Sequence, residues 1–256
     1  MKNKILQLLR DNAGSNTAEN KVRLVRNETG TDATLYIYDV IDAWWGIAAI
    51  DVAKAIADIA ASTTLHVRIN SPGGDVFEGQ AIATAIRNHP GKTIAHIDGL
   101  AASAATFISA AADEVEISEG AFYMIHNGWT LAMGDKQVML DTADLLAKVD
   151  GSIVAAYATR TGADVAQITT WMDAETWFTA QEAVDHGFAN RLMPAPDKSA
   201  GNQAPGAKAW NLSAYSKTPQ ALTQPPERPD ADTALAQAAA QQRARNERRL
   251  RLLQID

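Results

Sequence analysis

Residues 98–112 read DGLAASAATFISAAA, and Ser103 stands there among seven alanines. The apolar stretch before it, residues 93–97, predicts a strand, and the small residues after it predict a helix. A strand, a tight turn at Asp98 and Gly99 and then a helix place Ser103 at a helix N-terminus, where free backbone N–H groups favour an anion. The alanines would let another backbone come close, as a peptide must to reach a nucleophile. On this stretch alone, an ordinary first-turn serine is the commoner explanation.

The composition narrows the class of protein. A chain of 256 residues with 46% hydrophobic content can bury a sizeable core in one or two domains. The absence of cysteine excludes disulfides, thiolate zinc sites and cysteine catalysis, and the net charge of −7 argues against general nucleic-acid binding. No apolar run approaches the roughly 20 residues of a membrane span, and no cleavage site follows the N-terminal segment. We therefore expect an unprocessed cytoplasmic protein without a membrane or nucleic-acid partner.

A change of composition near residue 194 predicts the end of a domain. Seven of the nine prolines lie at or after Pro194. From Ala195 onward nine Lys and Arg face six Asp and Glu, whereas residues 1–194 carry a net charge of −10. Pro-rich sequence is typical of a linker, and the Ala-, Gln- and Arg-rich end of the chain could form a basic helix. The predicted organisation is an N-terminal segment at 1–33, a main domain at 34–194, a flexible Pro-rich linker at 195–230 and a basic, helix-compatible tail at 231–256.

Strands and helices alternate along the main domain. Residues 34–41 and 64–70 have the β-branched and aromatic content of strands, and residues 46–61 between them carry apolar residues at helical spacing. A helix at 76–88 and the strand at 93–97 continue the alternation. This βαβα order predicts an α/β fold with a parallel sheet and right-handed crossovers. Further patterns predict strands at 114–117, 121–125 and 188–193, and helices at 134–160, 164–171 and 180–186.

Residues 70–74, NSPGG, follow one predicted strand and precede a predicted helix. The two glycines allow positive φ and close approach of backbone, so an N–H group there could point into a site. A simple tight turn explains the motif about as well. The motif lacks the lysine and the spacing of a phosphate-binding loop, so nucleotide binding is not expected.

A serine nucleophile needs a base, and His126 is the candidate because it ends the strand predicted at 121–125, where that strand would meet the Ser103 turn. An orienting carboxylate would complete the set. Asp173 and Glu175 both lie before the helix predicted at 180–186, where capping of that helix is the competing explanation. Spacing alone does not decide whether these carboxylates orient His126 or cap that helix. The other histidines have ordinary explanations in a strand, in turns or at the surface: His66, His89, His96 and His186.

Four motifs together resemble one known family. They are INSPGG at 69–74, DGLAASAATF at 98–107, YMIHN at 123–127 and FTAQEAVDHGFAN at 178–190. In this order and approximate spacing they are similar to the proteolytic subunit of Clp protease, ClpP, and the resemblance covers about residues 34–194. It implies a ClpP/crotonase-like fold of repeated βαβ units, with a protruding handle helix after residue 134 that mediates ring stacking.

The resemblance also implies roles for individual residues. Ser103 would be the nucleophile and His126 the general base, while the backbone N–H groups of Gly74 and Ala104 would form the oxyanion hole. Substrate would add as an extended strand beside Gly73 and Gly74.

The acid of the triad is the first departure from the family. Counting back from FTAQEAV, the family's aspartate falls on Glu175, which is therefore the favoured third member. The alternatives are that Asp173 takes this place through a shifted loop or that the third member is weak. No cofactor or metal is expected.

A second departure concerns the ends of the chain. The N-terminal region matches poorly the family's axial loop, which docks the unfoldase, and the sequence after residue 194 is extra. These features resemble phage or prophage ClpP-like proteins associated with head maturation. We therefore expect a homo-oligomeric serine endopeptidase, in single or stacked rings, that processes capsid or scaffold proteins. No Walker motif is present, so any unfoldase ATPase would act in trans.

Two alternatives belong to other classes. The chain could be a non-enzymatic assembly or scaffolding protein that keeps the fold, in which case the linker and basic tail would engage an acidic capsid protein. It could also be a crotonase-like acyl-CoA enzyme, although the coincidence of Ser103 with His126 counts against this.

Overall fold

The computed structural model describes residues 4–13, 22–193 and 210–223. The chain divides into two units, Met1–Pro219 and Gln220–Asp256. The described part of the second unit contains the short helix α8 (Gln220–Thr223).

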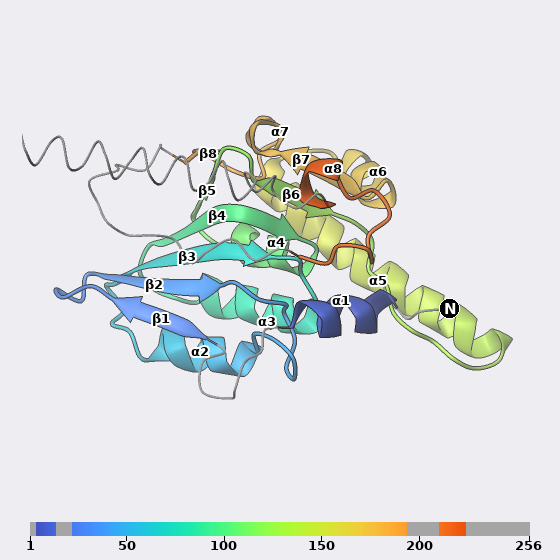
Figure 1. Cartoon of the computed structure of the whole chain (residues 1–256), viewed down its shortest axis with the longest axis horizontal. Coiled ribbons are helices and arrows are strands. Elements are labelled where there is room, and N and C mark those ends of the chain that lie inside the picture. The colour runs from blue at the N-terminus through green and yellow to red at the C-terminus, as the bar shows by residue number, and fades with distance from the viewer. Residues whose placement is uncertain (1–3, 14–21, 194–209, 224–256) are drawn as a thin grey trace, which may run out of the picture. The chain divides into compact units, whose positions relative to one another are not determined.

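The described residues of the first unit form an eight-stranded sheet, as Figure 1 shows. Its main path runs β1-β2-β3-β4-β5-β8; β6 pairs with the far half of β4, and β7 pairs with β6. The pairs from β2 to β5, β5 with β8 and β4 with β6 are parallel, while β1 and β7 pair antiparallel. The strands are β1 (Arg23–Arg26), β2 (Asp32–Ile37), β3 (Thr64–Ser71), β4 (Thr93–Ala102), β5 (Glu114–Ile117), β6 (Phe122–Ile125), β7 (Thr176–Thr179) and β8 (Arg191–Leu192).

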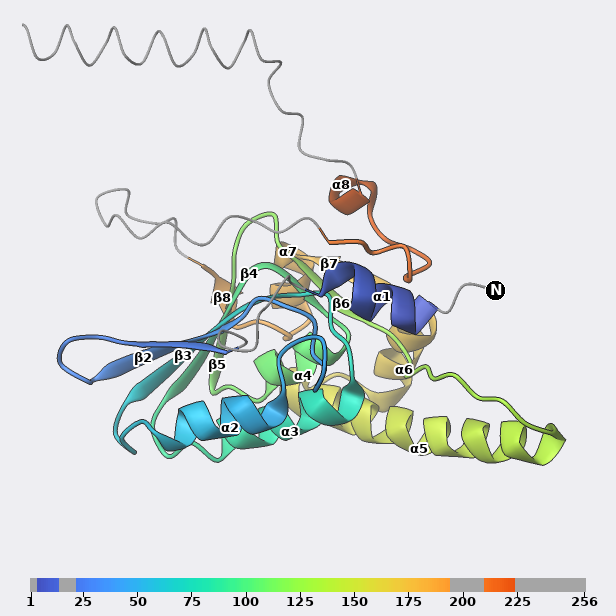
Figure 2. The same cartoon turned by 60° about the horizontal axis from the view of Figure 1, so that its bottom comes forward.

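One face of the sheet is covered by helices because the strands are apolar on that side. Alternate residues of β2 and β3 are buried, and α2, α3 and α4 lie against that face (Figure 2). Aspartate or threonine caps begin several helices, among them Asp75 before α3 and Thr179 before α7. The helices of the first unit are α1 (Lys4–Asn12), α2 (Ala49–Ala57), α3 (Val76–Arg87), α4 (Ala104–Ala110), α5 (Lys136–Thr161), α6 (Val165–Asp173) and α7 (Ala180–Asp185).

Helix α5 is 26 residues long, and only its second half joins the core. Its buried residues are Ile153, Val154 and Tyr157, whereas the first half extends beyond the sheet in Figures 1 and 2. This is the protruding helix expected after residue 134. The α/β class is confirmed.

The turn before Ser103 differs from the prediction. The sequence predicts a turn at Asp98 and Gly99, but β4 continues to Ala102, so the turn falls on Ser103 itself. The reason is a change of partner: the first half of β4 pairs with β5, and residues 100–102 pair with β6. Pairing with β6 satisfies the backbone N–H and C=O groups of residues 100–102, so the strand continues there and no turn forms.

Both ends of the chain also differ from the sequence-based expectation. Helix α1 lies in the predicted N-terminal segment, for which no helix is predicted. Residues 210–219 lie in the predicted linker 195–230 but belong to the first unit and pack on it. The tail predicted at 231–256 lies outside the described residues. Within the described ranges, no helix has the length and apolar character needed to cross a bilayer.

Candidate active site

Ser103 occupies the junction between β4 and α4 in an unusual backbone conformation. Its φ is 53° and its ψ is −124°, a region that costs a residue with a Cβ about 1–3 kcal/mol. The Ser103 N–H donates to the Met124 carbonyl at 2.9 Å, so pairing with β6 holds the strained residue in place. The side chain lies in a mostly buried position, 7% exposed.

His126 follows the end of β6 and faces this serine. Because Ala102 pairs with Met124 in the parallel ladder, the residues just beyond each strand meet. The His126 Nε2 lies 2.7 Å from the Ser103 Oγ. Burial lowers the pKa of His126 to about 4, so the imidazole is neutral at pH 7 and able to accept the serine proton.

Gly73 and Gly74 pass directly beside Ser103, with φ values of 90° and 153°. A Cβ on Gly73 would lie 2.8 Å from the Ser103 Cβ and 3.1 Å from the Ala104 N, so only glycine fits there. Ile41 donates to the Gly73 carbonyl and accepts from Asp75, which leaves the Gly74 N–H directed away from Ile41. The Ala104 N–H is in the first turn of α4 and has no acceptor within its helix. Both N–H groups are therefore available for the oxyanion role that the sequence predicts.

The two candidate carboxylates are engaged elsewhere. Asp173 accepts from the Asn127 side-chain amide at 2.7 Å. Glu175, with φ of 49°, accepts from the backbone N–H of Ser216 at 2.9 Å and of Lys217 at 2.6 Å. Among the contacts of the described residues, neither carboxylate accepts a hydrogen bond from His126.

The charge of Glu175, however, raises the pKa of His126 and offsets part of the effect of burial. The structure thus brings together Ser103, His126 and the glycine pair, but not a hydrogen-bonded acid.

Comparison with known proteins places the chain in a family. The model of the Clp protease family matches residues 47–195. The chain belongs to the Clp protease family. It is 31% identical over 137 residues to ATP-dependent Clp protease proteolytic subunit 1 of Corynebacterium jeikeium, covering 53% of this chain and 73% of that one. It is 29% identical over 142 residues to proteolytic subunit 2 of Rhodococcus jostii, covering 55% and 73%.

A solved structure supports the same assignment. A point mutant of ClpP1 from Listeria monocytogenes superposes with a TM-score of 0.56 at 26% identity, covering 62% of this chain and 90% of that one. The family resemblance stated from the four motifs is confirmed. The roles assigned to individual residues stay predictions.

Residues 210–219 lie beyond the Clp protease match and reach the candidate site. The Tyr215 ring meets the His126 ring edge-on, with centroids 5.4 Å apart, and its hydroxyl donates to the Pro72 carbonyl at 2.5 Å. Sequence reasoning missed this residue. A signal existed, since Trp210 and Tyr215 are the two aromatic residues of the last 62 positions, 195–256, and both fall in this segment.

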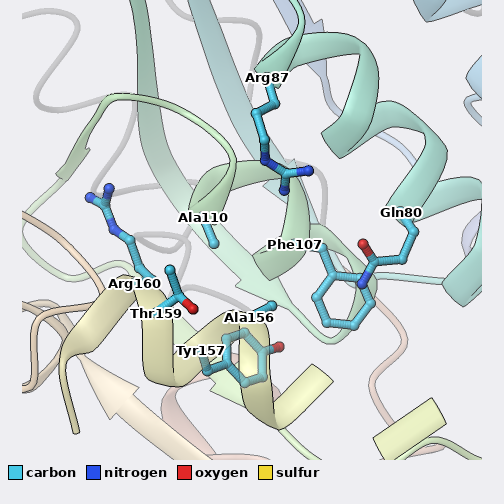
Figure 3. Close-up of a pocket in the computed structure, with 8 residues that line it drawn as sticks. All are labelled: Gln80, Arg87, Phe107, Ala110, Ala156, Tyr157, Thr159 and Arg160. Carbon is cyan, nitrogen blue, oxygen red and sulfur yellow. The ribbon is translucent and has the colours of Figure 1, made fainter. Parts of the chain in front are cut away.

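An apolar hollow of about 210 Å³ opens beside the glycine pair. Gly74 forms one side, Leu8 and Leu9 of α1 another and Leu145 and Leu146 of α5 a third. A larger hollow of about 430 Å³ lies between α3, α4 and α5 and includes Arg87 and Arg160 (Figure 3), but neither Ser103 nor His126 lines it. Neither residue lines the smaller hollow either, but Gly74 does, which makes it the better place for a side chain of a substrate. In the described part of the chain, no three His, Asp or Glu side chains gather as metal ligands.

Proposed function

We propose that this Clp protease family member is a serine endopeptidase with Ser103 as nucleophile and His126 as general base. The observation that carries the proposal is the 2.7 Å contact between the Ser103 Oγ and the His126 Nε2 at a strained backbone position. Strain of this kind persists where the surrounding fold enforces it, and it gathers at active sites.

The reaction follows from these positions. The Ser103 Oγ attacks the scissile carbonyl while His126 takes its proton, and the N–H groups of Gly74 and Ala104 stabilise the charge that develops on the carbonyl oxygen. His126 then delivers the proton to the leaving amine. Water, deprotonated by the same imidazole, hydrolyses the acyl-enzyme. Glu175 is the acid that orients His126, because its charge already acts on the imidazole.

The substrate is an extended peptide beside Gly73 and Gly74, with one apolar side chain in the hollow between α1 and α5. The chain assembles with copies of itself, as a ring, and a separate ATPase unfolds its substrates where unfolding is needed. The Corynebacterium jeikeium and Rhodococcus jostii relatives are named ATP-dependent, which supports the involvement of an ATPase.

We further propose that the substrates are capsid or scaffold proteins of a phage head. Support comes from the parts of the chain outside the family match. Helix α1 and residues 210–219 both pack at the site and both lie outside residues 47–195. A peptidase of specialised substrate range has use for such additions, whereas a general degradative subunit needs an open site.

A fluorophosphonate probe, followed by intact mass, tests the peptidase proposal. The unmodified chain should gain one probe at Ser103, and Ser103→Ala and His126→Ala should gain none. Ser118→Ala, which changes the serine that follows β5, should label like the unmodified chain. An unlabelled but folded oligomer would contradict the proposal.

The competing function is a scaffold that keeps the fold without hydrolysis. It is favoured by one observation, that the Glu175 carboxylate is bound to Ser216 and Lys217 instead of His126. Co-expression with the capsid protein separates the two. If Ser103→Ala abolishes processing, the chain is the peptidase, and if processing and assembly are both unchanged, it is the scaffold.

A further inference from the structure

Residues 211–218, here called the strap, cross the candidate site from outside the family match. The strap adds no strand to the sheet and no helix to the core. Three of its side chains are nevertheless buried, Leu212 at 3%, Ala214 at 5% and Tyr215 at 6% exposed. A segment without regular structure that buries these residues must be held by specific contacts.

One end of the strap is fixed by helix α1. The Asn12 side chain donates to the Asn211 carbonyl at 2.8 Å and accepts from the Asn211 N–H at 2.6 Å. The Gln7 side-chain amide donates to the Ser213 hydroxyl at 3.1 Å. Figure 2 shows this part of the chain, in orange-red, beside α1. Two elements that the family match leaves out therefore bind each other next to the catalytic pair.

The middle of the strap covers that pair. The Tyr215 ring packs against His126, Trp129 and Trp177, with centroid separations of 5.4, 6.1 and 5.7 Å. Its hydroxyl binds the Pro72 carbonyl, one residue before the glycine pair where a substrate strand would run. Burial raises the pKa of this hydroxyl, and the Ser103 side chain offsets part of that rise.

The far end of the strap holds the acid. The Ser216 N–H binds one carboxylate oxygen of Glu175, and the Lys217 N–H binds the other. The Trp177 indole also donates to Glu175, at 3.3 Å. In this arrangement the Glu175 carboxylate accepts from these three donors and not from His126.

We propose that the strap is an autoinhibitory occupant of the active site, bound in cis through Tyr215, that must leave before substrate and the Glu175 carboxylate can reach Ser103 and His126. This proposal rests on the proposed peptidase function. It identifies the aromatic cleft formed by Trp129 and Trp177 as a binding site for an aromatic residue of a peptide. A peptide that carries such a residue competes with Tyr215 for the cleft.

The test uses the full chain with two changes, Tyr215→Ala and the matched control Tyr36→Ala, which removes a tyrosine from β2. Two reagents report on the site by mass spectrometry. The fluorophosphonate reports on Ser103, and diethyl pyrocarbonate, which acylates neutral imidazole whether or not the serine is activated, reports on His126. We expect both to react roughly tenfold faster in Tyr215→Ala, because the competent fraction rises, and within about twofold of the unmodified rate in Tyr36→Ala.

A peptide in trans makes the test specific. The blocked heptapeptide NLSAYSK, residues 211–217, should restore slow reaction of both groups in Tyr215→Ala, and the same peptide with alanine in place of tyrosine should not. Lys217→Pro removes one N–H donor to Glu175 and keeps Tyr215. Lys217→Pro should speed both reactions by about threefold. This second variant keeps the proposal testable if Tyr215→Ala does not fold.

The results separate this proposal from the proposed function. Faster acylation of His126 without labelling of Ser103 in any chain supports the strap and contradicts the peptidase. Unchanged or slower reaction of both groups in the folded variants makes the strap a structural support and overturns the proposal. Equal effects of the two peptides also overturn it, since the cleft would not recognise the tyrosine.

Discussion

Ser103 and His126 are positioned by strand pairing, whereas the Glu175 carboxylate is held by a segment that enters from outside the sheet. The first two residues follow paired positions of β4 and β6, and changing their separation requires breaking that ladder. Glu175 depends on two N–H groups of the strap, which adds no strand to the sheet. The half of the site that holds the proposed nucleophile and base is thus fixed by the fold. The half that tunes the base can change while the fold stays intact.

The largest effect should come from breaking the fixed half with Gly73→Ala. The new Cβ would lie 2.5 Å from the Ala102 carbonyl oxygen and 2.8 Å from the Ser103 Cβ, at a φ of 90°. We expect the free energy of unfolding to fall by about 3 kcal/mol and labelling of Ser103 to fall at least about 100-fold. Chemical denaturation and probe kinetics measure the two.

Gly120→Ala is the matched control for this change. Gly120 has a similar φ of 81°, but a Cβ there meets nothing within 4 Å. Only the backbone strain remains, so we expect a loss of about 1 kcal/mol and unchanged labelling. Equal losses of stability and of labelling in Gly73→Ala and Gly120→Ala would show that the close packing of Gly73 against Ser103 contributes to neither.

The contrast between the fixed and the movable half of the site also explains which features can be predicted from the sequence alone. The fixed half is encoded locally: a serine among alanines, a histidine at a strand end and a glycine pair each leave a pattern. The parallel sheet then brings them together, because residues at the ends of neighbouring strands meet. The sequence nevertheless misplaces the turn before Ser103, since the pairing of β4 with β6 overrides the Asp98 and Gly99 turn signal.

The movable half depends on contacts between distant residues. Asn12 and Asn211 lie 199 positions apart, and no short-range pattern links them. Helix α1, with nine residues, is too short to be stable alone and depends on burial of Leu8 and Leu9. The strap lies in a stretch whose prolines predict a linker, although Trp210 and Tyr215 mark the part of it that packs. Which carboxylate serves His126 could not be settled from spacing for the same reason, because the answer depends on the strap.

The pH dependence of Ser103 labelling should differ between the unmodified chain and Tyr215→Ala, by about tenfold at pH 5. Burial lowers the pKa of His126 to about 4, and the base acts only when it is neutral. In the unmodified chain, labelling should therefore stay constant from pH 7 to 5 and fall about tenfold per pH unit only below the pKa. In Tyr215→Ala water reaches the imidazole, so its pKa rises toward the ordinary value of about 6.5. Labelling of that variant at pH 5 should be about tenfold below its rate at pH 8.

Unfolding must be followed over the same pH range. A buried neutral histidine binds its proton first in the unfolded chain, so stability is complete above about pH 6.5 and declines as the pH falls toward the pKa in the folded state. Circular dichroism at each pH separates this loss from titration of the base. Identical pH profiles for the folded unmodified and Tyr215→Ala chains would mean that Tyr215 does not shield His126.

The smallest effect should come from the acid, and it should depend on the strap. In the unmodified chain, Glu175→Gln weakens the hold on the strap, which opens the site, and also removes the charge that supports His126, which weakens the base. These consequences oppose each other, so we expect labelling to fall by about threefold or less. In Tyr215→Ala only the loss of the charge remains, and the same change should lower labelling by roughly tenfold or more.

Asp173→Asn is the matched control, because the Asp173 carboxylate accepts from Asn127 and its charge does not act on the pKa of His126. It should alter labelling less than about twofold in either background. Probe kinetics on the four combinations of Glu175→Gln and Tyr215→Ala give the coupling between the acid and the strap. If Glu175→Gln costs the same with and without Tyr215, the strap does not withhold the acid, and the separation between a fixed and a movable half of the site is lost. If Asp173→Asn instead shows the larger loss, the third member of the triad is Asp173, reached through a shifted loop.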